Sequence, residues 1–597
     1  WGSQFSRSSN KLKTLRRSGY YREIIVAFGQ PQPKTSNATA IKQRVFDLSV
    51  QSWQKHVENL PTLTDAWISS VRKAERRKLS LADGISAPLT ADKALAAAWC
   101  LSHRIRRLSP EQNIGLLLPT SIGGVLCNMA TLLAGKTIVN LNYTANAAAL
   151  TTAIEQAEIR TIYTSRRFIE RLEKKNADVI TVLQGKHLIY LEDLRSDIHF
   201  NESFWRWLAI RVLPTRILKR VCNHTHDSQQ TAAILFSSGS EGLPKGVMLS
   251  HQNIMANLKQ ISDVVNTQEQ DVLMSCLPLF HAFGLTVNQF MPLIEGIPMV
   301  CHADPTDAVG VAKTIAQYRA TILCGTSTFF RLYAKHPKVH PLMMESLRIV
   351  VAGAEKLNPV VREAFLTRFN KHILEGYGAT ETTPVASVNL PDCLDTQYWD
   401  LQVGSKHGSV GMPLPGSSVR IVDPQTFEQL PTGCDGMILI GGPQVMQGYL
   451  NNPEKTDSAI KVIDDSRWYI TGDKGHLDED GFLFIVDRYS RFAKIGGEMI
   501  SLGAVELATQ QVLPEEAEVI AVNVPDDKKG EQIVLLTTTM LDLDTLKKAM
   551  LANGCNPLLL PAQILILEQL PKLGSGKTDF NRAKQVTLQR VIQDQAE

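Results

Sequence analysis

The segment Phe236-Ser-Ser-Gly-Ser-Glu-Gly-Leu-Pro-Lys-Gly-Val247 decides how the rest of this 597-residue chain is interpreted. The apolar run directly before it, residues 232–236, predicts a buried strand. Glycines let backbone N–H groups approach an anion, hydroxyl groups add donors, and a lysine adds positive charge. The segment therefore predicts a phosphate-binding loop. It is not a Walker A loop, because Pro244 rather than glycine precedes Lys245. Taken alone, it could also be a flexible surface loop.

Six further segments follow this loop in a fixed order. They are Pro278-Leu-Phe-His-Ala-Phe-Gly284, Gly353-Ala-Glu-Lys-Leu357, Tyr377-Gly-Ala-Thr-Glu381, Tyr469-Ile-Thr-Gly-Asp473, the stretch from Asp487 to Lys494, and Gly574-Ser-Gly-Lys577. Together they resemble the acyl-adenylate-forming superfamily, which includes acyl-CoA synthetases, peptide-synthetase adenylation domains and luciferases. The resemblance implies an α/β fold. A large adenylate-forming domain, with two helix-covered sheets and a β-rich subdomain, would precede a small mobile α+β C-terminal domain.

The resemblance also implies ATP as a substrate and Mg²⁺ as a cofactor. The β- and γ-phosphates would be held by Ser237, Ser238, Gly239, Ser240, Gly242 and Lys245. Glu381 would hold Mg²⁺, since a hard cation that bridges phosphates binds carboxylate oxygens. Thr380 would donate its hydroxyl to the α-phosphate. Because a carboxylate must meet an anionic phosphate, the site has to neutralise charge.

The nucleoside and the catalytic groups are assigned by the same resemblance. The residues placed around adenine are Tyr377 and Gly378 on one side and Gly353, Ala354 and Glu355 on the other. Asp473 would accept both ribose hydroxyls, with Arg488 close by. Lys577 would stabilise charge in the transition state, and His281 would lie beside the acyl pocket. The alternatives are a turn residue for Asp473, a surface lysine for Lys577 and a hydrogen-bonded pocket wall for His281.

A second step would pass the acyl group to a thiol. In the superfamily the small domain swings about a hinge between the two steps, so that one site serves both reactions. The commonest hinge pattern is Gly-Arg-x-Lys-Asp, whereas this chain has Asp487-Arg-Tyr-Ser-Arg491. Arg491 stands where Asp or Lys is usual. The departure leaves adenylation intact and leaves the exact pivot open.

A narrower resemblance concerns the acid and the acceptor. The segments that carry it are Leu141-Asn-Tyr-Thr144, the serine-glycine loop, Gly325-Thr-Ser-Thr-Phe329, residues 351–357 and Phe492-Ala-Lys-Ile-Gly-Gly-Glu-Met499. They resemble the bacterial bifunctional enzymes that join a 2-acylglycerophosphoethanolamine acyltransferase to an acyl-ACP synthetase. This implies a long-chain fatty acid, the phosphopantetheine thiol of acyl carrier protein as acceptor, and a lysophospholipid as final acceptor in the intact protein. It also implies a place at the cytoplasmic face of the bacterial inner membrane.

The residues alone do not separate acyl carrier protein from CoA, so a long-chain fatty acyl-CoA ligase is the alternative. An apolar channel is expected near Phe283, Phe329 and Phe330. An acidic carrier could meet the cations Arg488, Arg491, Lys494, Lys528 and Lys529, although a solvated charged face explains them equally well. Two other classes are a luciferase-like oxidising enzyme and a non-catalytic lipid-binding scaffold. The presence of Lys577 and Glu381 argues against the scaffold.

The first part of the chain predicts a different domain. Residues 1–6 and 24–31 resemble the last strands of glycerolipid acyltransferase domains of the PlsC type, and the helical stretch 40–60 would end that domain. We therefore expect a fragment with an acyltransferase remnant at 1–60, a linker at 61–80, the large domain at 81–487 and the small domain at 488–597. The His-x4-Asp motif of such acyltransferases is missing there. His302 and Asp307 match it by coincidence, deep inside the ligase region.

Net charge, cysteine pattern and hydropathy exclude several classes of protein. The net charge of +4 is too small to indicate nucleic-acid binding. The nine cysteines form no CxxC pair, so neither a zinc site nor a disulfide framework is predicted, which favours a reducing compartment. No run of about 18 apolar residues predicts a transmembrane helix. The segment from Phe204 to Arg220 has two tryptophans, five cations and no acid. It predicts a helix at a membrane surface, with a helix packed on the large domain as the alternative.

Overall fold

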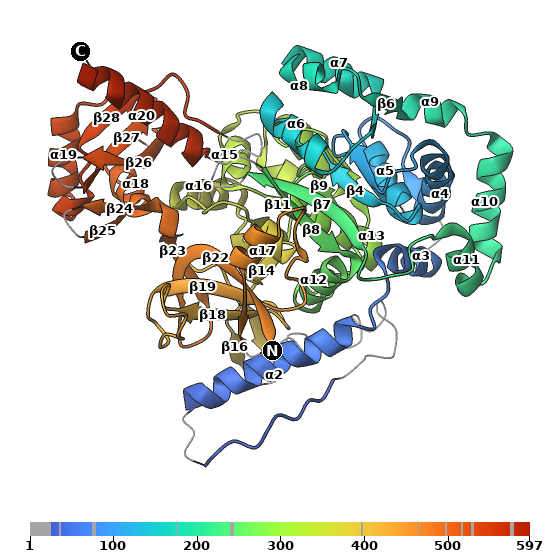
Figure 1. The fold of residues 1–597 in the computed structure, drawn as a ribbon, viewed down its shortest axis with the longest axis horizontal. Coiled ribbons are helices and arrows are strands. Elements are labelled where there is room, and N and C mark those ends of the chain that lie inside the picture. Colours follow the sequence, from blue (N-terminus) through green and yellow to red (C-terminus); the bar gives the residue numbers. More distant parts are fainter. Residues whose placement is uncertain are drawn as a thin grey trace. The chain divides into compact units, whose positions relative to one another are not determined.

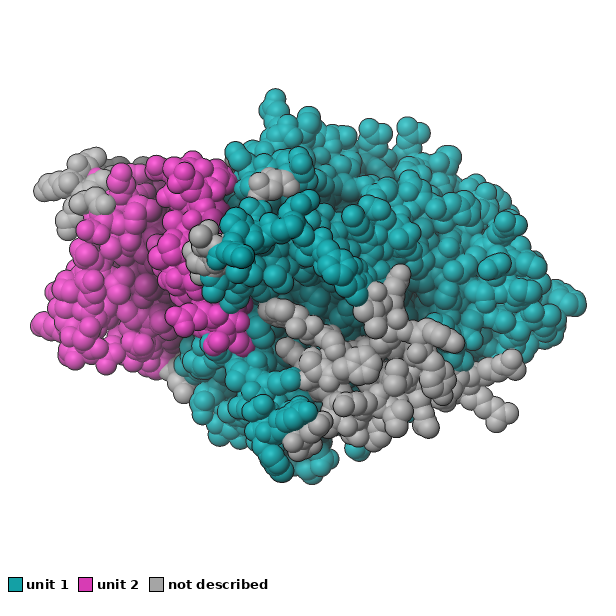
Figure 2. Space-filling model, turned by 90° about the horizontal axis from the view of Figure 1, so that it is seen from below, with its two compact units in different colours: residues 1–239, 243–419, 439–470 teal, residues 240–242, 420–438, 471–597 magenta. Residues whose placement is uncertain are grey.

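The computed structural model describes residues 25–34, 38–74, 79–175, 177–238, 244–395, 398–463, 465–495, 498–514, 517–526, 530–572 and 578–596. Contacts divide the chain into two compact units, shown in Figure 2. Unit 1 comprises residues 1–239, 243–419 and 439–470, and unit 2 comprises residues 240–242, 420–438 and 471–597. The division passes through the strands β18 (Ser418–Val422), β19 (Gly436–Gly441) and β22 (Ser466–Leu477). Residues 471–487 thus group with the C-terminal part, whereas the sequence predicted a boundary at 487.

The first large sheet of unit 1 has nine strands and is parallel over most of its width (Figure 1). Its spatial order is β17 (Met412–Pro413), β14 (Val385–Val388), β13 (Ile373–Gly378), β12 (Ile349–Ala352), β11 (Ile322–Gly325), β9 (Leu273–Ser275), β10 (Met299–Cys301), β1 (Leu79–Asp83) and β2 (Leu89–Thr90). The strands from β13 to β1 pair in parallel. They are short and mostly buried, as expected for strands covered by helices on both faces.

The second large sheet has seven strands and carries the predicted phosphate loop. Its order is β20 (Gly448–Tyr449), β8 (Pro244–Ser250), β7 (Thr231–Ser238), β4 (Thr137–Asn140), β3 (Asn113–Leu116), β5 (Thr161–Thr164) and β6 (His187–Tyr190). The strands β7 and β8 form an antiparallel hairpin. Residues 239–243, between these two strands, fall outside the described part of the chain.

Helices connect the strands of both sheets. They are α4 (Ala91–Leu108), α5 (Ile122–Leu133), α6 (Ala147–Gln156), α7 (Arg166–Lys175), α8 (Ala177–Leu183), α9 (Leu191–Ser196), α10 (Phe200–Val212), α11 (Thr215–Cys222), α12 (His251–Val264), α13 (Met291–Glu295), α14 (Ala308–Tyr318), α15 (Ser327–Lys335), α16 (Pro359–Phe369) and α17 (Pro453–Ala459). Side-chain caps fix several of their starts. Ser250 and Asn253 form a capping box at α12, and Asp307 accepts a hydrogen bond from the Gly310 N–H at α14.

His302 and Asp307 therefore have a structural explanation. The His302 Nε2 lies 3.2 Å from the Asp307 carboxylate, whose other oxygen caps α14. This agrees with their interpretation as a chance match to the acyltransferase motif.

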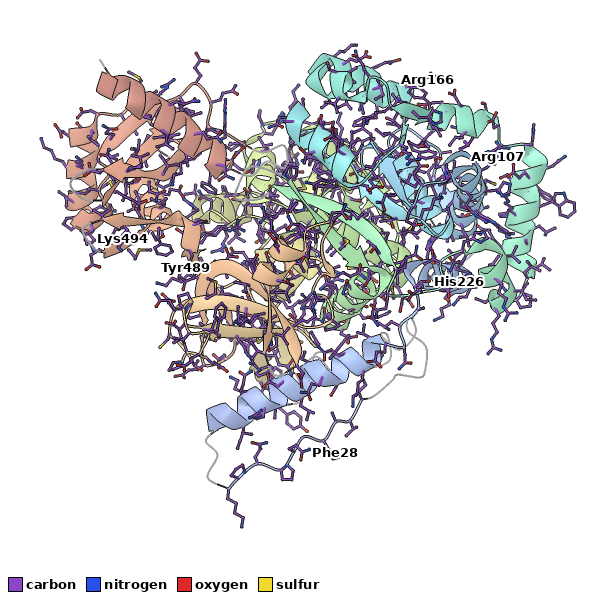
Figure 3. The ribbon with its side chains drawn as sticks, viewed as in Figure 1. Phe28, Arg107, Arg166, His226, Tyr489 and Lys494 are labelled. Atoms are coloured by element: carbon purple, nitrogen blue, oxygen red, sulfur yellow. The ribbon has the colours of Figure 1, made fainter. Side chains whose placement is uncertain are left out.

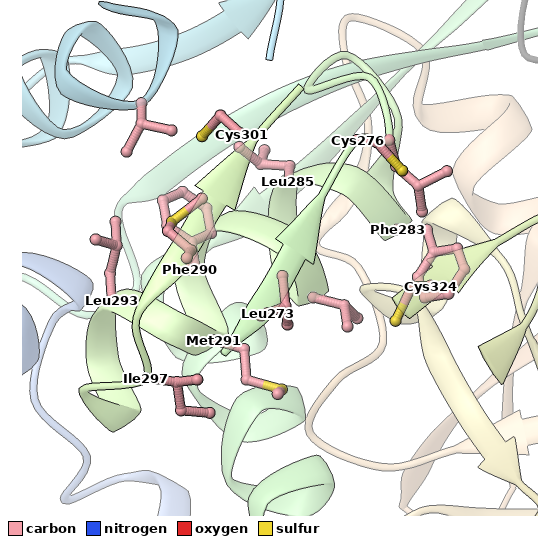
Figure 4. Packing of buried hydrophobic residues seen from close by; sticks show 14 of the residues in the cluster. Leu273, Cys276, Phe283, Leu285, Phe290, Met291, Leu293, Ile297, Cys301 and Cys324 are labelled. Carbon is pink, nitrogen blue, oxygen red and sulfur yellow. The ribbon is translucent and has the colours of Figure 1, made fainter. Parts of the chain in front are cut away.

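A π-helix, η1 (Phe283–Phe290), follows the predicted pocket segment and is buried along its whole length. It packs against β9, α12 and α13 in the main apolar core, where Leu285 lies near Cys301 and Phe283 lies near Cys324 (Figure 4). π-helical turns are uncommon and often occur beside functional sites. The π-helical geometry could not be predicted from the sequence, because the apolar pattern of these residues fits an ordinary buried helix equally well.

Two helices precede the first strand. The helix α2 (Ala38–Val57) overlaps the helical stretch predicted at 40–60, and Trp53 packs so close to Gly416 that a Cβ there would lie 2.2 Å from the indole. The helix α3 (Leu63–Lys73) lies in the segment predicted as a linker. Its Leu63, Trp67 and Ile68 are buried in the main core. The buried residues Leu63, Trp67 and Val71 recur every four positions, which is the spacing of a core-facing helix.

Unit 2 has a small α+β arrangement with its own core. The sheet order is β25 (Glu498–Ser501), β24 (Phe492–Ile495), β27 (Gly530–Thr537) and β26 (Val519–Asp526), with β28 (Gln563–Ile566) paired to β27. The helices are α18 (Leu502–Gln510), α19 (Leu543–Ala552) and α20 (Phe580–Ala596). Apolar side chains alternate along β26 and β27 and form two buried clusters. The predicted fold class is confirmed. Among the described residues, no helix is long and apolar enough to cross a bilayer.

Candidate active site

The candidate site of unit 1 lies at the carboxyl edge of the nine-stranded sheet. The strands β9, β11, β12 and β13 are neighbours and run parallel, so the segments that leave their carboxyl ends emerge at one edge. Those segments contain His281 after β9, Gly353 to Glu355 after β12, and Thr380 and Glu381 after β13. The predicted pocket, adenine and magnesium segments, which are far apart in sequence, are therefore brought to the same edge.

The predicted adenine loop after β12 is tightly held. The Gly353 N–H donates to the Gly325 carbonyl over 3.1 Å, and a Cβ on Gly353 would lie 3.0 Å from the Phe283 ring. Ala354 has a φ of +73°, a conformation that costs a non-glycine residue energy and often marks functional loops. The Glu355 carboxylate accepts a hydrogen bond of 2.6 Å from the Thr328 N–H at the start of α15.

The segment after β13 turns sharply. A Cβ on Gly378 would lie 1.7 Å from the Pro384 carbonyl oxygen, so only glycine fits there. The chain then enters a short 3-10 helix, η3 (Thr380–Thr382), in which Thr380 is half-buried and Glu381 is buried. Tyr377, the predicted adenine contact, is partly exposed.

Glu381 and Lys245 converge on one tyrosine. The Tyr449 hydroxyl donates to Glu381 Oε1 over 2.9 Å, and the Lys245 Nζ lies 5.4 Å from the centroid of the Tyr449 ring. The Met446 N–H also donates to the Glu381 carbonyl over 2.8 Å. Burial, and then the neighbouring Glu381 carboxylate, raise the pKa of Tyr449, so its hydroxyl stays protonated and keeps donating. The structure thus links the predicted phosphate lysine to the predicted magnesium ligand.

Tyr449 was not predicted from the sequence. It belongs to β20, a two-residue strand that pairs with β8 next to Lys245, with Tyr449 opposite Val247. Its partner Glu381 lies 68 positions earlier in the chain. A contact at this separation leaves no local pattern, and the only sequence signal is a tyrosine within a segment rich in glycine.

The phosphate loop itself is described only at its two ends. Ser237 and Lys245 face each other across the β7–β8 hairpin. Ser238 belongs to β7, but its side chain is outside the described residues, as are Gly239, Ser240 and Gly242. The structure therefore supports a hairpin in which Ser237 and Lys245 pair on the two strands that flank the predicted phosphate loop. The contacts predicted for the loop stay predictions.

His281 is half-buried at the entrance to η1. The imidazole Nδ1 accepts a hydrogen bond of 3.3 Å from the Phe283 N–H, and the backbone N–H of His281 donates to the Pro278 carbonyl over 3.2 Å. The imidazole therefore helps to shape the turn before the π-helix. This geometry fits the pocket-wall alternative and leaves a catalytic role for His281 as a prediction.

The predicted ribose pair lies in unit 2. Asp473 is opposite Arg488 on the paired strands β22 and β23 (Leu483–Arg488), and the Arg488 Nε donates to Asp473 Oδ1 over 2.9 Å. Asp473 is buried, whereas the Arg488 side chain is exposed. The structure brings these two residues together. Lys577, the predicted catalytic lysine, lies in residues 573–577, outside the described part of the chain.

The predicted hinge residue Arg491 is firmly held within unit 2. Its Nη2 lies 2.6 Å from Glu506 and its Nη1 3.7 Å from Asp487, while its guanidinium carbon lies 3.9 Å from the centroid of the Phe580 ring. Burial raises the pKa of Glu506, although Arg491 opposes this. Arg491 is thus an anchor of this unit, and the position of the pivot stays a prediction.

The carboxylate of Glu381 fits Mg²⁺. One of its oxygens accepts the hydrogen bond from Tyr449, which fixes the position of the group, and Glu381 directly follows Thr380 in η3. No cluster of three or more His, Cys, Asp or Glu side chains that could hold a metal occurs in the described ranges. Mg²⁺ does not need such a cluster at a nucleotide site, because it usually takes one or two carboxylates, substrate phosphates and waters.

Comparison with known proteins shows which family this chain resembles. Residues 73–450 match the model of the family described as AMP-binding enzyme. A long-chain-fatty-acid--CoA ligase of Escherichia coli O6:H1 is 28% identical over 512 residues, which is 82% of this chain and 86% of that protein. A ligase of the same name from Salmonella typhimurium is 31% identical over 376 residues, which is 62% of each chain.

Solved structures agree on the fold. ATP-bound MatB from Rhodopseudomonas palustris matches with a TM-score of 0.71 and 24% identity, over 88% of this chain and 98% of that one. The o-succinylbenzoate CoA synthetase MenE from Bacillus subtilis, in complex with its acyl-adenylate intermediate, matches with a TM-score of 0.70 and 21% identity, over 87% and 97%. At these identities the likeness establishes the fold alone.

Proposed function

Because this chain belongs to the AMP-binding enzyme family, we propose that it joins a long-chain fatty acid to CoA through an acyl-adenylate. The observation that carries the proposal is the convergence of Lys245 and Glu381 on Tyr449. This arrangement puts one cation and one carboxylate, the two groups that a magnesium–triphosphate needs, at fixed positions in one unit. The names of the relatives support the substrate, since they are long-chain-fatty-acid--CoA ligases.

In the first step a carboxylate oxygen of the fatty acid attacks the α-phosphorus of ATP. The bond from that phosphorus to the bridging oxygen breaks, and pyrophosphate leaves. Lys245 neutralises phosphate charge, and Thr380 donates a hydrogen bond to the α-phosphate. Glu381 would hold Mg²⁺, which supplies Lewis acidity to the phosphates when bound. Lys577 would stabilise the charge that builds as the two anions meet.

In the second step the CoA thiolate attacks the acyl carbonyl. A thioester forms, the acyl–phosphate bond breaks, and AMP leaves with the electron pair. The proton of the thiol goes to solvent when the thiolate forms. Asp473 and Arg488 would hold the ribose of the nucleotide in both steps.

The apolar surroundings of the site suit a fatty acyl chain. Phe283, Phe329 and Phe330 are buried beside the carboxyl ends of β11 and β12, where Gly325 and Gly353 leave room for aromatic rings. A Cβ on Gly325 would lie 2.9 Å from the Phe330 ring. Long alkyl chains gain free energy on leaving water for such an environment, at about 0.8 kcal/mol per CH₂ group.

Acyl carrier protein is the acceptor that the resemblance ranked first, and the relatives' names favour CoA instead. One cation of the set proposed for an acidic carrier, Arg491, is paired with Glu506 inside unit 2. Lys528 and Lys529 lie outside the described residues, so their contact with a carrier stays a prediction. Transfer to a lysophospholipid and a place at the inner membrane stay proposals.

The test is pyrophosphate release with palmitate, ATP and Mg²⁺, with CoA or acyl carrier protein as acceptor. We expect turnover with CoA, and its loss in Lys577→Ala. The matched control is Lys548→Ala, which changes an exposed lysine of α19 and should keep full activity. Turnover with the carrier protein alone would replace the CoA proposal. Absence of fatty-acid-dependent release at every chain length would remove the ligase proposal in favour of a scaffold, and oxygen consumption would indicate an oxidising enzyme.

A further inference from the structure

The helices α10 and α11 carry an exposed apolar surface, here called the α10–α11 surface. Its apolar members have side chains 41–80% exposed: Phe200, Phe204, Trp205, Val212, Ile217 and Val221. Phe204 contacts both aromatic neighbours, with ring centroids 6.1 Å from Phe200 and 5.7 Å from Trp205. Single exposed apolar residues are ordinary, whereas a contiguous aromatic group marks an interaction site.

The opposite face of α10 is fastened to α4, which fixes the exposed face outward. Trp207 donates its indole N–H to Asp92 over 3.0 Å, and Arg211 pairs with the same carboxylate at 2.6 Å and lies over the Trp207 ring. Arg206 donates to the Trp99 carbonyl and pairs with Glu202. Two of the five cations predicted for the membrane, and one of the two tryptophans, are therefore structural. The other tryptophan, Trp205, faces outward.

The charge at the α10–α11 surface is positive. Arg216 and Arg220 are exposed, and neither side chain has a hydrogen bond or ion pair with the part of the chain that the structure describes. Lys219 lies 3.9 Å from Asp65, so it is only loosely paired. No acidic residue occurs between Ser203 and Cys222. Figure 3 marks two more basic side chains on adjoining elements, Arg107 at the end of α4 and His226 just after α11, and both are exposed.

A second exposed apolar group in unit 1 provides a contrast. The hairpin of β15 (Cys393–Asp395) and β16 (Asp400–Gln402) exposes Trp399, 74% accessible, together with Leu401. Its strands end in Asp395 and Asp400, so it is acidic where the α10–α11 surface is basic. Exposed aromatic residues alone therefore do not identify a partner. The sign of the charge around them indicates whether the partner is anionic or cationic.

We propose that the α10–α11 surface binds the face of a bilayer that contains anionic lipid. Phe200, Phe204 and Trp205 enter the boundary between headgroups and acyl chains, while Arg216 and Arg220 meet lipid phosphates. Exposed aromatic side chains beside arginines that have no partner in the described part of the chain are what such a boundary selects, and the one acid of α10, Glu202, is paired with Arg104 and Arg206. An acidic protein would match the cations but not the outward aromatic group, so we assign the surface to lipid. This inference does not depend on the proposed ligase activity.

The test is flotation of the purified chain with vesicles of phosphatidylcholine, with and without phosphatidylglycerol at about one third. We expect binding to the anionic vesicles and at least about tenfold weaker partition for Arg216→Glu/Arg220→Glu, since each juxtamembrane cation contributes about 1 kcal/mol. We expect a comparable loss for Phe204→Ala/Trp205→Ala. The matched controls are Lys335→Glu/Lys338→Glu, two exposed lysines at the end of α15 and beyond it, and Trp399→Ala on the acidic hairpin.

Each outcome decides the proposal. Loss of partition in both α10–α11 variants, with both controls at the level of the unchanged chain, supports it. Partition that survives both variants, or that falls equally in the controls, overturns it. If the chain binds equally well to vesicles without anionic lipid, the proposed contact of Arg216 and Arg220 with anionic headgroups is wrong. If the α10–α11 variants change self-association in the absence of lipid, a second copy of the chain is the occupant and the proposal is wrong. Circular dichroism of each variant checks that it is folded.

Discussion

At the residue scale, Tyr449 joins two groups of the candidate active site. We expect Tyr449→Phe to raise the Mg²⁺ concentration needed for half-maximal pyrophosphate release by about 10–100-fold. Its hydroxyl orients the buried Glu381 carboxylate, and loss of such a supporting group weakens metal binding by this amount. The matched control is Tyr333→Phe, which removes a buried hydroxyl that donates to the Pro305 carbonyl over 2.8 Å and has no contact with Glu381 among the described residues. An unchanged Mg²⁺ dependence in Tyr449→Phe would contradict the assignment of Glu381.

His251 makes the folding stability of unit 1 depend on pH. Burial lowers its pKa from 6.5 to about 3, and its Nδ1 already accepts a hydrogen bond from the Leu63 N–H. Between these two values the unfolded chain binds a proton that the folded chain does not. Stability is therefore complete above pH 6.5 and falls as the pH falls, by about 1.4 kcal/mol per pH unit.

The measurement is urea unfolding at pH 7.5 and pH 5.5. His251→Gln should reduce the loss of stability between these values, because glutamine can accept the same hydrogen bond without taking up a proton. His187→Gln, a change of an exposed histidine on β6, is the control and should behave as the unchanged chain does. Equal pH dependence in both variants would show that other groups dominate in this range.

At the scale of elements, the two tryptophans of α10 have different tasks. We expect Trp207→Ala to lower the free energy of unfolding by about 2 kcal/mol, because a half-buried indole and its hydrogen bond to Asp92 are lost. Trp205→Ala should change it by less than about 0.5 kcal/mol, since Trp205 is exposed. Thermal and urea unfolding of both variants measure the difference. Equal destabilisation would mean that α10 is not fastened through Trp207.

The same helix illustrates what a sequence can and cannot predict. Composition predicted a basic, aromatic helix at this place, because tryptophans, cations and missing acids are visible without coordinates. It could not say that Arg206 and Arg211 turn inward, since α4 supplies the Trp99 carbonyl and the Asp92 carboxylate from more than 100 positions earlier. The order of the motifs likewise predicted the fold class. The link between Glu381 and Tyr449, the π-helix η1 and the burial of α3 required the tertiary structure.

At the scale of the whole molecule, the two units have separate apolar cores, and the clusters around Ile533 and Val534 lie entirely in unit 2. Separate cores predict separate cooperative transitions, so calorimetry should resolve two heat-absorption peaks. Arg491 contributes to the core of unit 2, the smaller unit, because its contacts Glu506, Asp487 and Phe580 all lie in unit 2.

We therefore expect Arg491→Ala to shift one calorimetric transition and to leave the other in place. Removing the guanidinium leaves the half-buried Glu506 carboxylate without its counter-charge, which costs up to about 3 kcal/mol. Arg582→Ala changes an exposed arginine of α20 in the same unit and should leave both transitions unchanged. A single transition that moves as a whole in Arg491→Ala would mean that the units unfold together. Two transitions of which neither moves would mean that Arg491 is free to act as a pivot after all.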